Sequence, residues 1–134
     1  MRYMLLIYTN ENAEQRSPEA EQKVVADHWA VMDEASRQGV FRAAEPLHPT
    51  STATTIRRKN GIVFTTDGPF AETKEQLAGY YILDCKDLDE AIAWAAKIPT
   101  CCGGGEGCIE IRPLRELSRE QQQDPTQYAN ALNG

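Results

Sequence analysis

Two short apolar runs place the strongest constraint on the fold of this chain. Residues 2–8 and 78–84 carry large apolar side chains at successive positions, so both faces of each expected strand need shielding from water. The sequence predicts two amphipathic helices, which are enough to cover one face of a sheet. The other face needs a separate cover, and a second copy of the sheet is the natural one. We therefore expect a homodimer.

The first helix is predicted from the residues at its two ends. Ser17 suits the N-cap and Pro18 the first helical position, while Gly39 suits the left-handed position that often ends a helix. This predicts a helix from about Pro18 to Gln38. Its apolar stripe includes Trp29 and has His28 near the centre, and a histidine there needs a hydrogen-bond partner when the stripe is buried.

The second helix is predicted over about residues 88–97. Asp87 and Glu90 have the spacing of a capping box, and Pro99 ends the pattern. Residues 108–112 then alternate between polar and apolar side chains, which favours a last strand.

A hairpin is predicted in the middle of the chain. Asn60 and Gly61 are the strongest short hairpin signal and suit a type I′ turn. They separate an outer strand over residues 50–59 from a return strand over residues 62–66. Residues 40–49 contain two prolines and the second histidine, His48, and are predicted to form a long loop, in which His48 is either a surface residue or a weaker site candidate.

The order of these elements predicts the fold class. Strand, helix, two or three strands, helix and strand is the βαββαβ plan of ferredoxin-like α+β domains, here with an extra hairpin strand. We expect one domain over residues 1–117. The polar tail, residues 118–134, is predicted to contain at most short helices.

Composition argues against several classes of partner. The chain of 134 residues has 20 acidic and 14 basic side chains, for a formal net charge of −6. This balance argues against non-specific binding to nucleic acid or to an anionic membrane. No apolar run approaches the roughly 20 residues of a membrane span. The apolar start of the chain is interpreted as a buried strand and not as a signal peptide, so a cytoplasmic protein is expected.

The four cysteines do not predict a metal site. Cys85, Cys101, Cys102 and Cys108 are expected to be reduced, and their spacing does not match the common zinc motifs. The alternatives are a redox role for Cys101 or Cys102, next to a glycine-rich run, and small side chains without chemistry. No metal and no cofactor is predicted.

The segment from Asp67 to Glu75, with the sequence DGPFAETKE, is expected to be an ordered loop. Pro69 restricts the backbone, and Phe70 is expected to fill a hydrophobic gap. Together with residues 79–83, GYYIL, this segment resembles the YCII-related family, also called the DGPF-domain family. The resemblance extends from residue 1 to about residue 114. It implies a dimeric α+β barrel, and it implies an occasional link to alternative sigma factors of transcription.

The resemblance also implies a catalytic pair. In the family pattern a histidine of the first helix pairs with the aspartate of the DGPF motif, which correspond here to His28 and Asp67. A carboxylate that binds one imidazole nitrogen raises the basicity of the other, as in a general base. This implies proton transfer on a small organic substrate, by elimination or isomerisation. The further candidates for substrate binding are Arg57, Phe70, Lys74, Tyr80 and Tyr81. Strand alternation directs one of the two tyrosines inward, and the alternative role of each is packing. The alternative for Arg57 and Lys74 is a solvated surface charge.

Two classes of function remain open from the sequence. The first is a cofactor-independent enzyme that uses His28 and Asp67. The second is a non-catalytic binding or regulatory homodimer, linked to a sigma factor, in which the pair is structural. An enzyme requires a cavity that a small molecule can enter, with the two side chains in contact at its wall.

Overall fold

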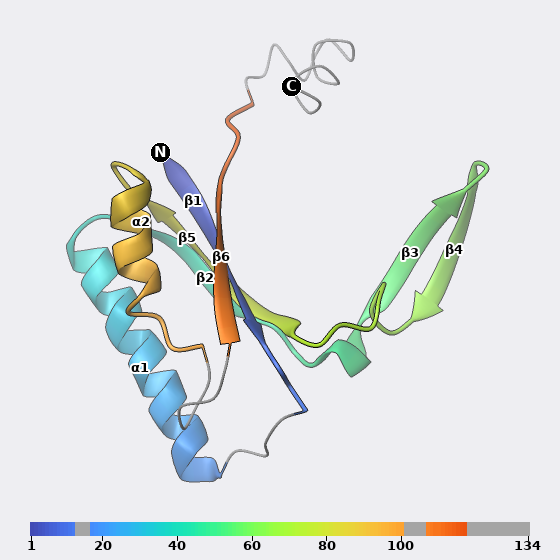
Figure 1. The fold of residues 1–134 in the computed structure, drawn as a ribbon, viewed down its shortest axis with the longest axis horizontal. Helices are drawn as coiled ribbons and strands as arrows, with labels where there is room; N and C mark the ends of the chain where they lie inside the picture. Colours follow the sequence, from blue (N-terminus) through green and yellow to red (C-terminus); the bar gives the residue numbers. More distant parts are fainter. Residues whose placement is uncertain (13–16, 101–106, 118–134) are drawn as a thin grey trace.

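The computed structural model describes residues 1–12, 17–100 and 107–117. The short helices predicted in the tail lie outside these residues, as do Cys101 and Cys102. Figure 1 shows the elements in chain order. They are β1 (Arg2–Thr9), α1 (Pro18–Arg37), β2 (Phe41–Pro46), the 3-10 helix η1 (Thr50–Thr52), β3 (Thr54–Lys59), β4 (Ile62–Asp67), β5 (Gln76–Asp84), α2 (Leu88–Ala95) and β6 (Gly107–Pro113).

Four of the strands form one antiparallel sheet in the order β2-β5-β1-β6. The two helices connect β1 to β2 and β5 to β6, so the chain follows the ferredoxin-like βαββαβ plan. Within residues 1–12, 17–100 and 107–117, the strands β3 and β4 pair only with each other and form a second, two-stranded sheet, inserted between β2 and β5. The predicted fold class is confirmed, and the insertion is a complete hairpin.

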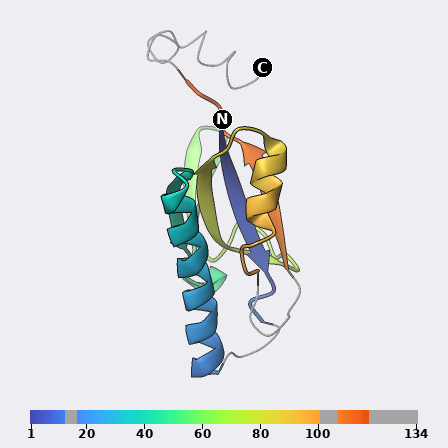
Figure 2. The same ribbon diagram turned by 90° about the vertical axis from the view of Figure 1, so that its left-hand side faces the viewer.

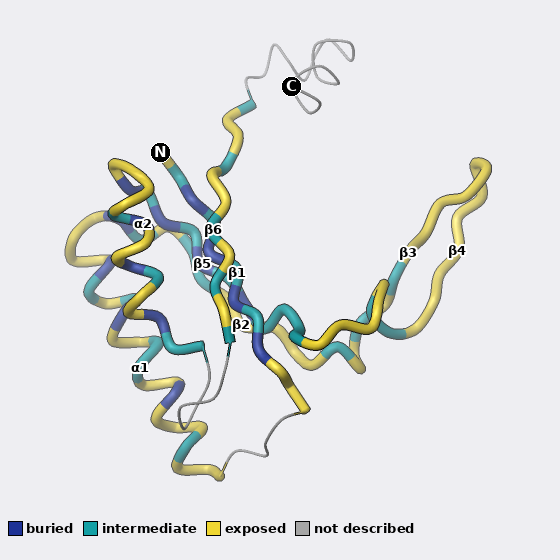
Figure 3. The backbone as a smooth tube through the Cα atoms, in the orientation of Figure 1, coloured by how far each residue is buried: buried dark blue, intermediate teal, exposed yellow. Residues whose placement is uncertain are grey.

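Both helices cover the same face of the four-stranded sheet (Figure 2). Residues Tyr3, Leu5 and Ile7 of β1 point to this face and are buried in the core, whereas Met4 and Leu6 between them point to the other face and are only half-buried. Figure 3 shows the buried residues gathered between sheet and helices. Among the described residues, one face of the sheet therefore has its core, and neither helix covers the other, which is called the open face.

The ends of α1 confirm the local signals. The Ser17 side chain accepts a hydrogen bond from the Ala20 backbone N–H at 3.1 Å, and Gly39 has a φ of +76°. At α2, the Asp87 carboxylate accepts from the Glu90 backbone N–H at 2.9 Å. The helix ends at Ala95, two residues before the predicted end.

The expectation that residues 40–49 form a loop was wrong. Phe41–Pro46 is the edge strand β2, paired with β5 from Phe41 opposite Leu83 to Pro46 opposite Gly79. The two alanines and the proline of this segment have weak strand propensity, so the local sequence favours a loop. The open edge of β5 overrides this preference because it offers backbone partners to the whole segment.

The predicted hairpin turn is present, but its position in the fold differs from the prediction. Asn60 and Gly61 have φ values of +52° and +77°, as a type I′ turn requires. The first strand starts only at Thr54, after η1, and neither strand joins the main sheet. The hairpin extends away from the helices, on the open side of the sheet (Figure 1).

Gly79 is the point of closest approach between β2 and β5. A Cβ atom at this position would lie 2.8 Å from the Glu45 carbonyl oxygen and 3.2 Å from the Pro46 Cα. We expect Gly79→Ala to lower the free energy of unfolding by about 1–3 kcal/mol, because backbone atoms would have to move apart. Urea unfolding measures this loss.

The control is Gly39→Ala, in which the added Cβ has no neighbouring atom within 4 Å. Only the positive φ of this residue is expected to lower the free energy of unfolding, by about 1 kcal/mol. A Gly79→Ala variant as stable as the parent chain would show that the two strands do not approach as closely as described.

Candidate functional site

A cavity of about 950 Å³ lies between α1 and the end of the sheet where β1 and β2 finish and β5 begins. Its helix wall includes Val24, Val25, Trp29 and Met32, at the spacing of one face of α1. Val25 and Trp29 are exposed in spite of their apolar side chains. Its size suits a small organic molecule, and its exposed apolar wall provides a surface for one.

His28 lies on this helix wall and is held by Tyr81 of β5. Its Nδ1 atom is 2.7 Å from the Tyr81 hydroxyl oxygen, and the two ring centroids are 5.9 Å apart with an interplanar angle of 31°. Tyr81 is only 2% exposed, and burial raises its pKa to about 12. The hydroxyl is therefore neutral at physiological pH, and it can either donate to Nδ1 or accept from it.

The second histidine, His48, also lines the cavity, from the segment between β2 and η1. Two contacts hold this segment. The Leu47 N–H donates to the Ala78 carbonyl oxygen at 2.8 Å, and the Glu11 carboxylate accepts from the Thr50 N–H and from the Thr50 hydroxyl. His48 is exposed but lies on a tethered segment.

The structure brings four of the predicted site residues to the cavity, namely His28, Lys74, Tyr80 and Tyr81. As strand alternation requires, Tyr81 is buried under the helices, whereas Tyr80 is half-buried. The catalytic and binding roles expected for these residues stay predictions.

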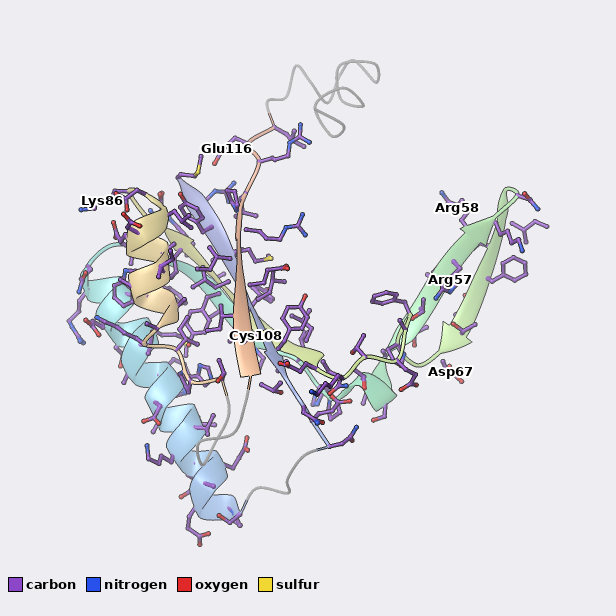
Figure 4. The ribbon with its side chains drawn as sticks, viewed as in Figure 1. Arg57, Arg58, Asp67, Lys86, Cys108 and Glu116 are labelled. Carbon is purple, nitrogen blue, oxygen red and sulfur yellow. The ribbon has the colours of Figure 1, made fainter. Side chains whose placement is uncertain are left out.

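The expected pairing of His28 with Asp67 inside one chain is corrected by the structure. Asp67 is exposed at the end of β4, on the hairpin that points away from α1 (Figure 4), and it is not among the residues that line the cavity. His28 is bound by Tyr81. The physical reason is that the hairpin leaves the sheet at its open side, whereas the cavity lies on the helix side.

Arg57 and Phe70 are likewise outside the cavity of their own chain. The Arg57 guanidinium donates to the Phe70 carbonyl oxygen, which folds the DGPF turn onto β3, and the Phe70 side chain is exposed. The expectation that Phe70 fills a hydrophobic gap was therefore wrong within one chain. The turn is ordered by its own contacts, including the Gly68 N–H donating to the Ala53 carbonyl oxygen at 2.7 Å.

Sequence reasoning missed three features of the site. It did not identify Tyr81 as a partner of His28, it gave Trp29 no role in binding, and it did not consider Glu11. The spacing of Trp29 one residue after His28 already placed both on one stripe of the helix. The other two depend on which strand lies under α1, and no local signal contains that information.

The described cysteines are not activated thiols. Burial raises the pKa of Cys85, which lies in the core. Cys108 is exposed on β6, and loss of hydration together with the nearby Glu75 carboxylate raises its pKa as well. Both shifts disfavour the thiolate. Among the described residues no group of three or more histidine, cysteine or acidic side chains is arranged to hold a metal ion.

Comparisons with known proteins place the chain among related sequences. The family model of the YCII-related domain matches residues 1–118. An uncharacterized protein of Rhizobium meliloti (strain 1021) is 38% identical over 115 residues, which cover 85% of this chain and 92% of that protein.

In the described part of the chain, no helix has the length and hydropathy needed to span a membrane.

Two solved structures have a distant likeness to the fold. One is the 5-chloro-2-hydroxyhydroquinone dehydrochlorinase TftG from Burkholderia phenoliruptrix AC1100, in complex with 2,5-dihydroxybenzoquinone, with a TM-score of 0.44, 11% identity, and coverage of 87% of this chain and 95% of that chain. The other is the divalent cation tolerance protein Cut A1 from Thermus thermophilus, with a TM-score of 0.40, 15% identity, and coverage of 92% of this chain and 93% of that chain.

Proposed function

The chain belongs to the YCII-related family, and we propose that it is a cofactor-independent enzyme that transfers a proton on a small organic substrate, by elimination or isomerisation. The observation that carries this proposal is the hydrogen bond between His28 and Tyr81 at the wall of a cavity of about 950 Å³. An imidazole held by a neutral hydroxyl beside a cavity is a suitable general acid or base.

Tyr81 acts in this proposal as a positioning residue. In the neutral imidazole one ring nitrogen carries a proton and the other accepts one. When His28 takes a proton from the substrate at Nε2, its Nδ1–H donates to the Tyr81 oxygen. The Tyr81 oxygen accepts this hydrogen bond before and after the transfer, and its pKa of about 12 keeps the hydroxyl neutral throughout.

The remaining cavity residues bind and orient the substrate. Trp29 and Val25 offer an apolar wall to its carbon skeleton. Lys74 is the only lysine or arginine among the described lining residues, and it is placed to attract a carbonyl or carboxylate oxygen. The described lining also includes four carboxylates, so a small neutral molecule with an apolar body and a carbonyl oxygen fits this distribution; the four are Glu11, Glu21, Glu45 and Glu75.

The enzyme is proposed to be a homodimer, joined through the open sheet face. Met4, Leu6 and Tyr8 of β1, with Tyr80 and Ile82 of β5, form this face and are half-buried in the single chain. Tyr80 also lines the cavity, so it lies where the cavity meets this face. A second sheet packed against it would remove these side chains from water and close a dimeric α+β barrel. Sedimentation equilibrium at micromolar concentration tests this, and a monomer would contradict it.

The catalytic proposal is tested by an exchange experiment that does not require the substrate to be known. The protein is incubated in D₂O with a mixture of small ketones, hydroxy acids and phenols, and mass spectrometry records which compounds take up deuterium. A proton-transfer enzyme is expected to accelerate uptake into one compound or a narrow class. Binding of a compound, seen by NMR, without any accelerated uptake would favour the non-catalytic binding protein.

A further inference from the structure

The hairpin formed by residues 54–67, called the arm below, has few contacts with the rest of the chain. In the part of the chain that the structure describes, β3 and β4 pack extensively only against each other. The arm joins the body at a narrow neck, where the Gly68 N–H donates to the Ala53 carbonyl oxygen at 2.7 Å. Both arm strands therefore have one unpaired edge.

The arm also exposes an unusual number of large apolar side chains. Ile56, Ile62, Val63 and Phe64 belong to its strands, and Phe70 is tied to it through the Arg57 contact. All five are between 48% and 72% exposed. An isolated two-stranded hairpin is marginally stable in water, so an arm of this composition requires a surface to pack on.

A second copy of this chain is the surface that the arm fits best. The arm projects on the side of the sheet opposite to the helices (Figure 1). That side is where a partner copy would lie. Any second copy also has an arm of its own, so a two-fold axis would satisfy both arms at once.

The charge distribution also favours a second copy of this chain as the partner of the arm. The arm contains Arg57, Arg58 and Lys59 against the single carboxylate of Asp67, in a chain with a net charge of −6. The rest of the chain is correspondingly acidic. The open sheet face has an apolar centre, and its two edge strands contribute Glu45 opposite Tyr80 and Glu110 opposite Leu6. A basic, apolar arm complements such a surface.

We propose that the arm of each protomer reaches across to the partner and packs its apolar side chains against it, with its three cations near the partner's rim carboxylates. The five exposed side chains would bury roughly 500 Å² on each arm, since a fully buried aromatic removes about 150–250 Å². Two arms would supply about 1,000 Å², a large share of the roughly 1,200–2,000 Å² of a standard interface. This arm contact goes beyond the proposed enzyme function and the sheet contact, and depends on neither His28 nor Tyr81.

The test is excision of the arm. Residues 54–67 are replaced by two glycines. Two residues can bridge the gap because Ala53 and Gly68 are hydrogen-bonded to each other at the neck. Sedimentation equilibrium is expected to show a dimer dissociation constant at least tenfold higher than that of the parent chain. In the parent chain, raising the salt concentration is expected to weaken association, and the excised variant is expected to lose most of that dependence.

A matched pair of single substitutions keeps the proposal testable if the excised variant does not fold. Phe64→Ser removes an exposed aromatic from the arm, whereas Thr65→Ser is a mild change at the next position of the same strand. Phe64→Ser is expected to raise the dissociation constant several-fold and Thr65→Ser to leave it unchanged. Amide exchange in the arm is expected to slow as protein concentration rises.

The outcomes separate the proposals. If the excised and Phe64→Ser variants have the same dimer dissociation constant as the parent chain, the arm contact is wrong and the sheet contact alone holds the dimer. A parent chain that is monomeric at micromolar concentration overturns both contacts. Neither result bears on proton transfer by His28, which the deuterium experiment measures separately.

Discussion

Replacing His28 by glutamine is expected to lower the rate of deuterium uptake into the substrate by roughly 100-fold or more, the range that general acid–base catalysis contributes. Glutamine retains an amide that can bond to the Tyr81 hydroxyl, but it cannot gain and lose a proton at neutral pH. The measurement is the exchange rate at equal concentrations of folded protein, with circular dichroism to confirm the fold.

The matched control is Asp33→Asn, an exposed residue on the same helix that does not line the cavity. It is expected to exchange at the parent rate. If His28→Gln exchanges at the parent rate as well but unfolds at a lower urea concentration, His28 is a structural residue and the catalytic proposal is wrong. Tyr81→Phe, which removes only the positioning hydroxyl, is expected to show a smaller loss, about tenfold.

The stability of the protein is expected to fall steeply between pH 10 and pH 12 because of Tyr81. Burial raises its pKa from 10.0 to about 12 in the folded chain, whereas the unfolded chain retains the ordinary value. Above pH 10 the unfolded state therefore loses this proton first, and stability decreases as pH rises. The stabilisation is complete below pH 10, and a shift of this size corresponds to a loss of about 2–3 kcal/mol by pH 12.

Tyr81→Phe isolates this contribution. The variant is expected to be less stable than the parent chain at pH 8 by about 1 kcal/mol, since it lacks the hydrogen bond to His28. Lysines and the other tyrosines titrate in both proteins, so their contributions cancel when the urea midpoint of Tyr81→Phe is subtracted from that of the parent chain at each pH. That difference is expected to shrink and then reverse between pH 10 and pH 12. A constant difference across this range would show that Tyr81 ionises as easily in the folded state as in the unfolded one.

The parts of the fold that the sequence predicts correctly are those with local signals. Ser17, Pro18 and Gly39 mark the ends of α1 because caps depend on a few neighbouring residues. The same holds for the Asn60-Gly61 turn. The strand β2 lacks such a signal, because its pairing with β5 joins residues that are 33 to 42 positions apart in sequence. Only the complete sheet shows that this edge has to be filled.

The site shows the same division. The helical stripe correctly places His28 and Trp29 on one wall, since the period of a helix is known in advance. Which side chain meets His28 depends on where β5 lies under α1, and this is set by the whole core. The apolar residues of β3 and β4 are equally compatible with a sheet strand and with an exposed hairpin, so the sequence does not reveal that the arm stands apart from the body.

The neck between Ala53 and Gly68 affects how the sequence of this protein can evolve. Because the chain enters and leaves the arm at adjacent backbone positions, residues can be added or removed there without altering the connectivity of the four-stranded sheet or the lining of the cavity. If both proposals hold, the arm contact and the proton-transfer site lie on separate stretches of the polypeptide, and the arm can be modified by selection, or by protein engineers, while the cavity is kept.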